Sequence, residues 1–353
     1  MIFYFVFLAT VMLLLTKEKI YGAGSFQIAW VLIFLLAALR FDVGYDYSFY
    51  FQLIEQSLKF IEDQLNRIEY LSRQLILFST NLKFTQLFFI VSSSIIYFLF
   101  YKTILDISED KRLSTLLFLC FPLFYFNSLS IVRQFIALSI IFYGVRFIFK
   151  KNITLFIGIV FIASQFHSSA VFGIFLYFIY NIKFKPYLIF LLYIFSFFSS
   201  ELVGYLVLSF SDKYAIYITK IGGEGGSIIL VFVKLMGLIM LPLTVVLNKY
   251  QDKELNFYFL SLYIGIFIWS SLSVYGHAGM RGALYFLIFL ILLLPKMLNK
   301  FKQRVLLKQG ILILFIILYG LNLYVGTKHK IKDPNIPYQT YIGKEKKDFK
   351  EIK

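Results

Sequence analysis

The sequence predicts an all-α, polytopic integral membrane protein with about 12 transmembrane helices in a single membrane domain, residues 1–353. Of its 353 residues, 60% are hydrophobic and 15% are charged, and the mean hydropathy is +0.79. A soluble domain is roughly half apolar and about a quarter charged. Apolar runs that suit a hydrocarbon layer about 30 Å thick recur along the chain, so a bilayer must solvate most of this surface.

The composition also excludes several classes of protein. The chain has one cysteine, Cys120, and three histidines, too few for a disulfide scaffold or a structural zinc site. The formal charge is +16, and in so apolar a chain basic residues mark cytoplasmic loops and anionic lipid head groups. We therefore expect no metal, no cofactor and no nucleic-acid partner, but extensive contact with membrane lipids.

Twelve apolar segments are predicted to form the membrane helices. Their cores lie near residues 2–15, 26–39, 84–104, 113–127, 134–149, 153–166, 169–181, 186–200, 227–247, 256–275, 282–295 and 310–326. No positive charge precedes the first segment, and Lys17 and Lys19 follow it, which is the reverse of a cleaved signal peptide. We expect a retained helix with its N-terminus outside, because this topology places most loop Lys and Arg residues inside.

Three longer segments are predicted on the outer side. In residues 40–83, apolar residues recur every three or four positions from Ile54 to Leu75, which predicts an amphipathic helix lying in the membrane interface. Residues 201–226 form a glycine-rich loop, either a flexible linker or a lid for a bulky substrate. The basic tail, 327–353, carries eight Lys, and an even helix count places it outside.

Polar and ionisable groups near the outer ends of these helices are the candidate site. In chain order they are Arg40, Asp46, Tyr50, Arg133, Gln134, His167, Arg281 and Tyr285. Burying an ion in hydrocarbon costs at least a few kcal/mol, so such groups usually pair or serve a function. Three Arg and one His meeting from separate hairpins would form a cationic pocket for a pyrophosphate or sugar phosphate.

Structural alternatives stand beside these interpretations. An Arg at a helix end can simply reach lipid phosphates. Glu69 and Arg73 have the spacing of an ordinary i,i+4 ion pair, and a structural role is favoured for both. Lys234 lies in the middle of a predicted membrane helix, where it either reaches the interface or faces a cavity.

The order of the short motifs resembles the EpsG-like, Wzy-type polysaccharide polymerases of bacteria. The motifs are Arg40-x-x-x-Gly44-x-Asp46-x-x-x-Tyr50, Arg133-Gln134-x-x-Ala137, Phe166-His167-x-Ser169-Ala170, Arg281-x-x-x-Tyr285 and Pro337-Tyr338. The resemblance implies a GT-C-like multi-helix glycosyltransferase that joins oligosaccharide repeat units linked to undecaprenyl pyrophosphate. It places the enzyme in the bacterial cytoplasmic (inner) membrane, with its active site facing the periplasm or exterior. A chain-length regulator protein is a possible partner.

The roles follow from the chemistry of displacing a pyrophosphate. Arg133 and Arg281 are expected to clamp it, with Arg40 as a second clamp or as a partner of Asp46. The proton of the acceptor hydroxyl would go to Asp46 or His167. The residues expected to bind substrate are Arg40, Tyr50, Gln134, Tyr285, Lys234, Glu69 and Tyr338.

Three other functions remain open at this stage. A ligase of the O-antigen type would use the same leaving group to move a finished polymer. A flippase or transporter of lipid-linked oligosaccharides would carry the same substrate, but such proteins tend to show internal repeats, and none is evident here. A membrane acyltransferase would also use His and Arg near the membrane.

Overall fold

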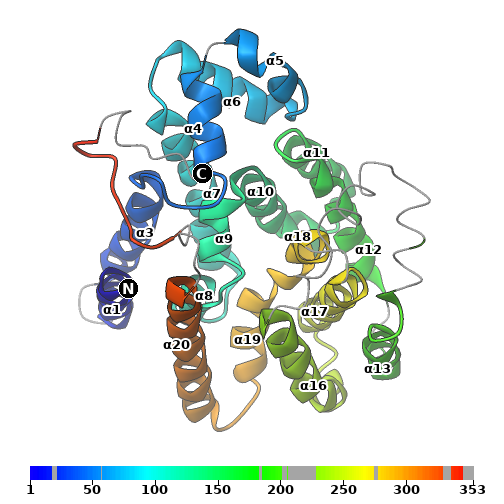
Figure 1. The fold of residues 1–353 in the computed structure, drawn as a ribbon. Coiled ribbons are helices and arrows are strands. Elements are labelled where there is room, and N and C mark those ends of the chain that lie inside the picture. Colours follow the sequence, from blue (N-terminus) through cyan, green and yellow to red (C-terminus); the bar gives the residue numbers. More distant parts are fainter. Residues whose placement is uncertain are drawn as a thin grey trace. The chain divides into compact units, whose positions relative to one another are not determined.

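The computed structural model describes residues 1–17, 22–56, 58–182, 185–200, 205, 228–273, 277–328 and 335–344 (Figure 1). Over these residues the chain is helical and forms no strand beyond an isolated bridge between Arg40 and Thr340. The chain divides into two compact units. Unit 1 comprises 1–143, 158–171 and 303–353, and unit 2 comprises 144–157 and 172–302.

Unit 1 is organised around one long helix, α7. The helices of this unit are α1 (Ile2–Thr16), α3 (Ala23–Ala38), α4 (Tyr47–Glu55), α5 (Leu58–Asn66), α6 (Tyr70–Asn81), α7 (Gln86–Ile107), α8 (Lys111–Cys120), α9 (Tyr125–Ser130) and α20 (Arg304–Lys328). α3, α6 and α8 pack against α7, and α20 packs against α8. The Asp110 carboxylate accepts from Leu113 N–H at the start of α8 and pairs with Lys308 Nζ at 2.8 Å, which ties α8 to α20.

Unit 2 is organised around α17, a helix that is buried on most of its surface. Its helices are α12 (Phe175–Asn181), α13 (Pro186–Phe195), α16 (Ile228–Asn248), α17 (Lys253–Ser271), α18 (His277–Leu287) and α19 (Leu290–Leu298). All five of the others pack against α17, as expected for a helix that is apolar all round. Lys296 Nζ bridges Asp252 and Glu254 at 3.4 and 2.9 Å, which joins α19 to the start of α17.

Three elements contain residues of both units: α10 (Val132–Phe149), α11 (Ile153–Ser164) and the 3₁₀ helix η1 (Ser168–Ile174). Each of the twelve predicted apolar segments coincides with one described helix or with two consecutive ones. Segment 113–127 is interrupted after Cys120, because Phe121 is extended (φ −77°, ψ 122°). Segment 282–295 falls in α18 and α19, which are bent by 44°.

The prediction of an all-helical membrane protein is confirmed. Among the described residues, α7, α10, α16 and α20 are long and apolar enough to cross a bilayer, and the bent pair α18–α19 is a possible fifth span. Several other apolar helices, including α1 and α11, have only 10–17 residues. The count of twelve spans and the GT-C-like architecture stay predictions.

The prediction of one amphipathic helix from Ile54 to Leu75 is wrong. The segment forms parts of α4, α5 and α6, because Gln56 (φ −80°, ψ 159°) and Glu69 (φ −60°, ψ 150°) are extended. Within the segment α5 is amphipathic, and Leu65 and Ile68 are buried; its position in the membrane interface stays a prediction. Because Glu69 is extended and precedes α6, its side chain points toward Arg133 and not along the surface of a helix.

The described part of the basic tail lies beside the end of α3. Phe41 N–H donates to the Gln339 carbonyl at 2.8 Å, and Tyr341 N–H donates to the Leu39 carbonyl at 2.9 Å. Tyr4 OH also donates to the Asn335 carbonyl at 2.7 Å. Residues 201–226, the predicted flexible loop, lie outside the described residues except for Tyr205.

Candidate functional site

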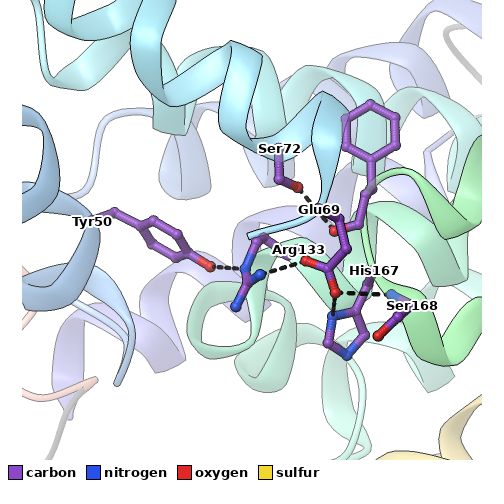
Figure 2. A network of polar contacts seen from close by, with 7 residues as sticks. Tyr50, Glu69, Ser72, Arg133, His167 and Ser168 are labelled. Atoms are coloured by element: carbon purple, nitrogen blue, oxygen red, sulfur yellow. Dashed lines mark hydrogen bonds and ion pairs between the residues drawn. The ribbon is translucent and has the colours of Figure 1, made fainter. Parts of the chain in front are cut away.

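Side chains from three distant parts of unit 1 form one polar network (Figure 2). Arg133 donates from Nη1 to Glu69 Oε2 at 2.5 Å and from Nε to the Tyr50 hydroxyl at 2.8 Å. The other carboxylate oxygen, Glu69 Oε1, accepts from Ser168 N–H at 2.9 Å and lies 3.3 Å from His167 Nδ1. One carboxylate thus holds a guanidinium and an imidazole together.

Backbone contacts between two turns place Glu69 in this position. Leu71 N–H donates to the Gln165 carbonyl at 2.9 Å, and the Ser72 hydroxyl donates to the Phe166 carbonyl at 2.9 Å. These bonds fasten the first turn of α6 to the connection between α11 and η1. Because Glu69 directly precedes α6, its side chain reaches the imidazole and the backbone N–H that follow in that connection.

The network is partly buried and charged. The side chains of Arg133, His167 and Glu69 are 22%, 21% and 17% exposed. Burial would raise the pKa of the Glu69 carboxyl, but the contacts with His167 and Ser168 N–H and the charge of Arg133 lower it to about 2. Glu69 is therefore an anion at neutral pH, and the pair with Arg133 is ionic.

Tyr50 supports the arginine from the opposite side. It is 1% exposed, and its ring lies 4.4 Å from the ring of Phe88 on α7. Burial raises the pKa of the Tyr50 phenol well above its usual value, so the hydroxyl is neutral when it accepts from Arg133 Nε. The arginine is held in the first turn of α10 by an anion and a neutral acceptor.

A match to a known protein family over most of the chain shows which family the protein belongs to. The family model described as the EpsG family matches residues 25–340, a range that contains the whole network. The chain belongs to the EpsG family. No curated protein and no solved structure matches it.

One residue of the first EpsG-like motif, Asp46, and one of the second, Gln134, lie next to the network along the chain. Asp46 precedes α4, and its carbonyl accepts from Tyr50 N–H at 3.1 Å, one helical turn on. Gln134 follows Arg133 and is 2% exposed. Both stay predicted site residues of this EpsG-family protein.

The guanidinium of Arg40, the first residue of the first EpsG-like motif, is hydrogen-bonded to groups of the protein itself. Arg40 is 1% exposed, and its guanidinium donates to the carbonyls of Ala37 at 2.5 Å and Val43 at 3.1 Å. Longer contacts of 3.4 Å reach the Leu129 carbonyl and the Ser93 hydroxyl. Its guanidinium carbon also lies 4.8 Å from the centre of the Phe89 ring. These contacts favour a structural role, so we do not include Arg40 in the proposed pyrophosphate clamp.

The remaining predicted residues divide between the two units. Tyr338 belongs to unit 1, where its hydroxyl donates to the Leu36 carbonyl at 2.9 Å and its ring stacks on Phe3 at 4.6 Å. Arg281 and Tyr285 lie on α18 in unit 2, and Tyr285 is fully buried. The expectation that Arg281 meets Arg133 in one pocket stays a prediction.

Lys234, in the middle of α16, is half-buried. Its ammonium lies 4.5 Å from the centre of the Phe197 ring. A cation above an aromatic face is stabilised by the ring quadrupole. This contact explains the depth of the lysine without a ligand, and its predicted role in binding substrate stays untested.

No metal centre is evident in the part of the chain that the structure describes, since no three His, Cys, Asp or Glu side chains there gather closely enough. A hollow of about 370 Å³ lies between α3 and α7, and aromatic residues including Trp30, Tyr97 and Tyr101 line it. The network residues are not part of its lining.

Glu69 has an ion-pair partner other than the one predicted from the sequence, whereas its predicted role in binding substrate stays a prediction. The expected i,i+4 pair with Arg73 is wrong: Glu69 pairs with Arg133, whereas Arg73 Nη1 lies 3.5 Å from Asn66 Oδ1. Helical spacing misled the interpretation because Glu69 itself is extended. The one sequence signal for Glu69 was an acidic residue in a long segment predicted to lie outside. The i,i+4 spacing to Arg73 explained that residue as part of an ordinary helical ion pair.

Proposed function

We propose that this protein is a membrane-embedded glycosyltransferase that polymerises lipid-linked oligosaccharide repeat units into O-antigen, capsule or exopolysaccharide. The donor is the growing chain on undecaprenyl pyrophosphate, and the acceptor is a new lipid-linked unit. The reaction takes place on the outer side of the bacterial cytoplasmic membrane. Membership of the EpsG family supports a polymerase-type function, and the network around Glu69 supplies the chemistry.

The bond that breaks joins the anomeric carbon of the donor to a pyrophosphate oxygen. An acceptor hydroxyl oxygen attacks that carbon, undecaprenyl pyrophosphate leaves, and the hydroxyl proton passes to a base. Negative charge grows on the leaving oxygen, and a fixed guanidinium stabilises such charge best in a partly dry site. Arg133 has this setting, and Figure 2 shows its Nη2 pointing away from Glu69 and Tyr50.

We assign His167 as the base and keep Asp46 as the alternative. Figure 2 shows His167 Nε2 pointing away from Glu69, so this nitrogen is available to a hydroxyl. The contact at Nδ1 favours a proton there and leaves Nε2 as the acceptor. Arg281 is proposed as the second pyrophosphate clamp on the strength of its motif alone.

The test is an assay of purified protein in vesicles with lipid-linked repeat units as the substrate. A ladder of products longer by whole units supports the polymerase. A single transfer of finished polymer to another acceptor would instead indicate a ligase, acyl incorporation an acyltransferase, and movement across the bilayer without new bonds a transporter. Each of these three results contradicts the proposal.

Variants separate the chemistry from the fold. Arg133→Ala and Arg281→Ala should abolish the ladder while folded protein accumulates in the membrane. Arg73→Ala is the matched control, because Arg73 is bound only loosely to Asn66 at 3.5 Å and should leave the ladder unchanged. A normal ladder from either of the first two variants would remove that arginine from the mechanism.

A further inference from the structure

The carboxylate of Glu69 is the only group of the network that touches both Arg133 and His167. Its two oxygens divide the work: Oε2 accepts from Arg133 Nη1, and Oε1 faces His167 Nδ1 and accepts from Ser168 N–H. The two nitrogens that would meet substrate, Arg133 Nη2 and His167 Nε2, both point to the lower side of the view in Figure 2. Glu69 therefore contacts Arg133 and His167 on the side opposite to the two nitrogens that the proposed reaction uses.

We propose that Glu69 is the positioning residue of the site, which fixes the His167 tautomer and holds Arg133 and His167 in register for one substrate. This inference rests on the proposed function. Glu69 itself takes no proton: the acceptor hydroxyl gives its proton to His167 Nε2, and the imidazolium that results is stabilised by the adjacent carboxylate. The pyrophosphate meets the guanidinium on the side away from Glu69.

The geometry indicates that Glu69 holds the Arg133 and His167 side chains in a fixed orientation and is more than one half of a surface ion pair. Glu69 is held by a backbone N–H and by the bonds of the neighbouring residues, Leu71 and Ser72, so the carboxylate has little freedom to follow its partners. Exposed pairs of long side chains contribute little, since ordering them costs entropy. Here backbone contacts hold the carboxylate, and both the imidazole and the guanidinium contact it.

The tautomer gives a test that does not depend on activity. The chain has only three histidines, His167, His277 and His329, so ¹⁵N-histidine labelling yields a spectrum that His167→Gln assigns directly. In the wild type, at a pH where the imidazole is neutral, we expect Nδ1 protonated and Nε2 unprotonated. Glu69→Gln should convert this signal to a mixture, because one amide oxygen cannot serve three donors. A wild-type signal with the proton on Nε2 would overturn the inference.

Kinetics give the second test. Glu69→Gln should lower kcat about 100-fold, within the range of a lost general base, while the KM for the lipid-linked unit stays within about threefold. Added to His167→Ala, the same substitution should lower the residual rate by less than about threefold, because residues that act as one unit are not additive. Glu62→Gln, an exposed carboxylate on α5, is the matched control and should retain the wild-type rate.

The outcomes distinguish the inference from the proposed function. Full activity in both Arg133→Ala and His167→Ala would contradict the proposed chemistry itself. Loss of activity in those variants with a normal kcat in Glu69→Gln would overturn only the inference. Equal losses from Glu69→Gln in the wild-type and His167→Ala backgrounds would also overturn it. Rates are compared per amount of monodisperse folded protein, and Glu69→Asp, with a shorter reach, should fall between the wild type and Glu69→Gln.

Discussion

Replacing Arg40 tests whether the first arginine of the EpsG-like motif stabilises the fold or binds substrate. Arg40→Met keeps most of the side-chain volume and removes every donor. Two close bonds, to the carbonyls of Ala37 and Val43, are lost inside the protein. Each buried acceptor left unsatisfied costs about 1–3 kcal/mol, so the two give a loss of about 2–6 kcal/mol, without the longer contacts at 3.4 Å.

The matched variant is Arg133→Met, which removes a partly buried pair whose arginine side chain is 22% exposed, and its main expected effect is on activity. In detergent, we expect Arg40→Met to lower Tm by at least about 3 °C and to reduce the yield of folded protein. Arg133→Met should lose activity even when the rate is compared per amount of folded protein. If Arg40→Met is as stable as the wild type yet inactive, Arg40 binds substrate and the structural interpretation fails.

Three more predictions address the surroundings of the network. Gly44→Ala should destabilise the protein more than any exposed substitution, since Gly44 has φ +98° and its added Cβ would lie 2.1 Å from the Leu129 carbonyl oxygen; an unchanged Tm would contradict this packing. The lowered pKa of Glu69, about 2, implies stabilisation that is complete above pH about 4.5 and lost as the pH falls toward about 2. The Tm difference between wild type and Glu69→Gln should therefore shrink over that range, and a constant difference would refute the charge effect. Tyr45→Cys should react with an impermeant thiol reagent in intact cells, because Tyr45 is 72% exposed next to the site and the native cysteine is buried; labelling only after permeabilisation would invert the topology.

Much of the helical framework follows from local sequence. Each apolar run predicts its own helix because backbone groups must be satisfied within the segment in hydrocarbon. The breaks differ in how predictable they are: Phe121 interrupts one apolar run, and Pro122, which follows it, is a local signal because a proline disfavours helical backbone at the residue before it. The bend between α18 and α19 also lies within a continuous apolar run.

The site is only partly predictable for a physical reason. Arg133 and His167 stand out as ionisable groups at the ends of apolar helices, and Tyr50 follows from its helical spacing after Asp46. The role of Glu69 depends on bonds between residues 71–72 and 165–166, which are far apart in the chain. No local pattern encodes such a contact, and local spacing favoured the wrong partner.

Arg40 shows the converse limit of sequence reasoning. An arginine at a helix end resembles a clamp for phosphate whether its guanidinium faces substrate or backbone carbonyls. The carbonyl of Leu129, a distant residue, helps to enclose it, and only the folded chain reveals that contact.

The most direct measurement is a cryo-EM structure of the protein in a lipid nanodisc with a non-cleavable lipid-linked repeat unit on pyrophosphate. The account predicts a phosphate oxygen within hydrogen-bonding distance of Arg133 Nη2 and a sugar hydroxyl at His167 Nε2, with Glu69 still behind both. A pyrophosphate bound elsewhere, with these two nitrogens facing no substrate, would contradict it.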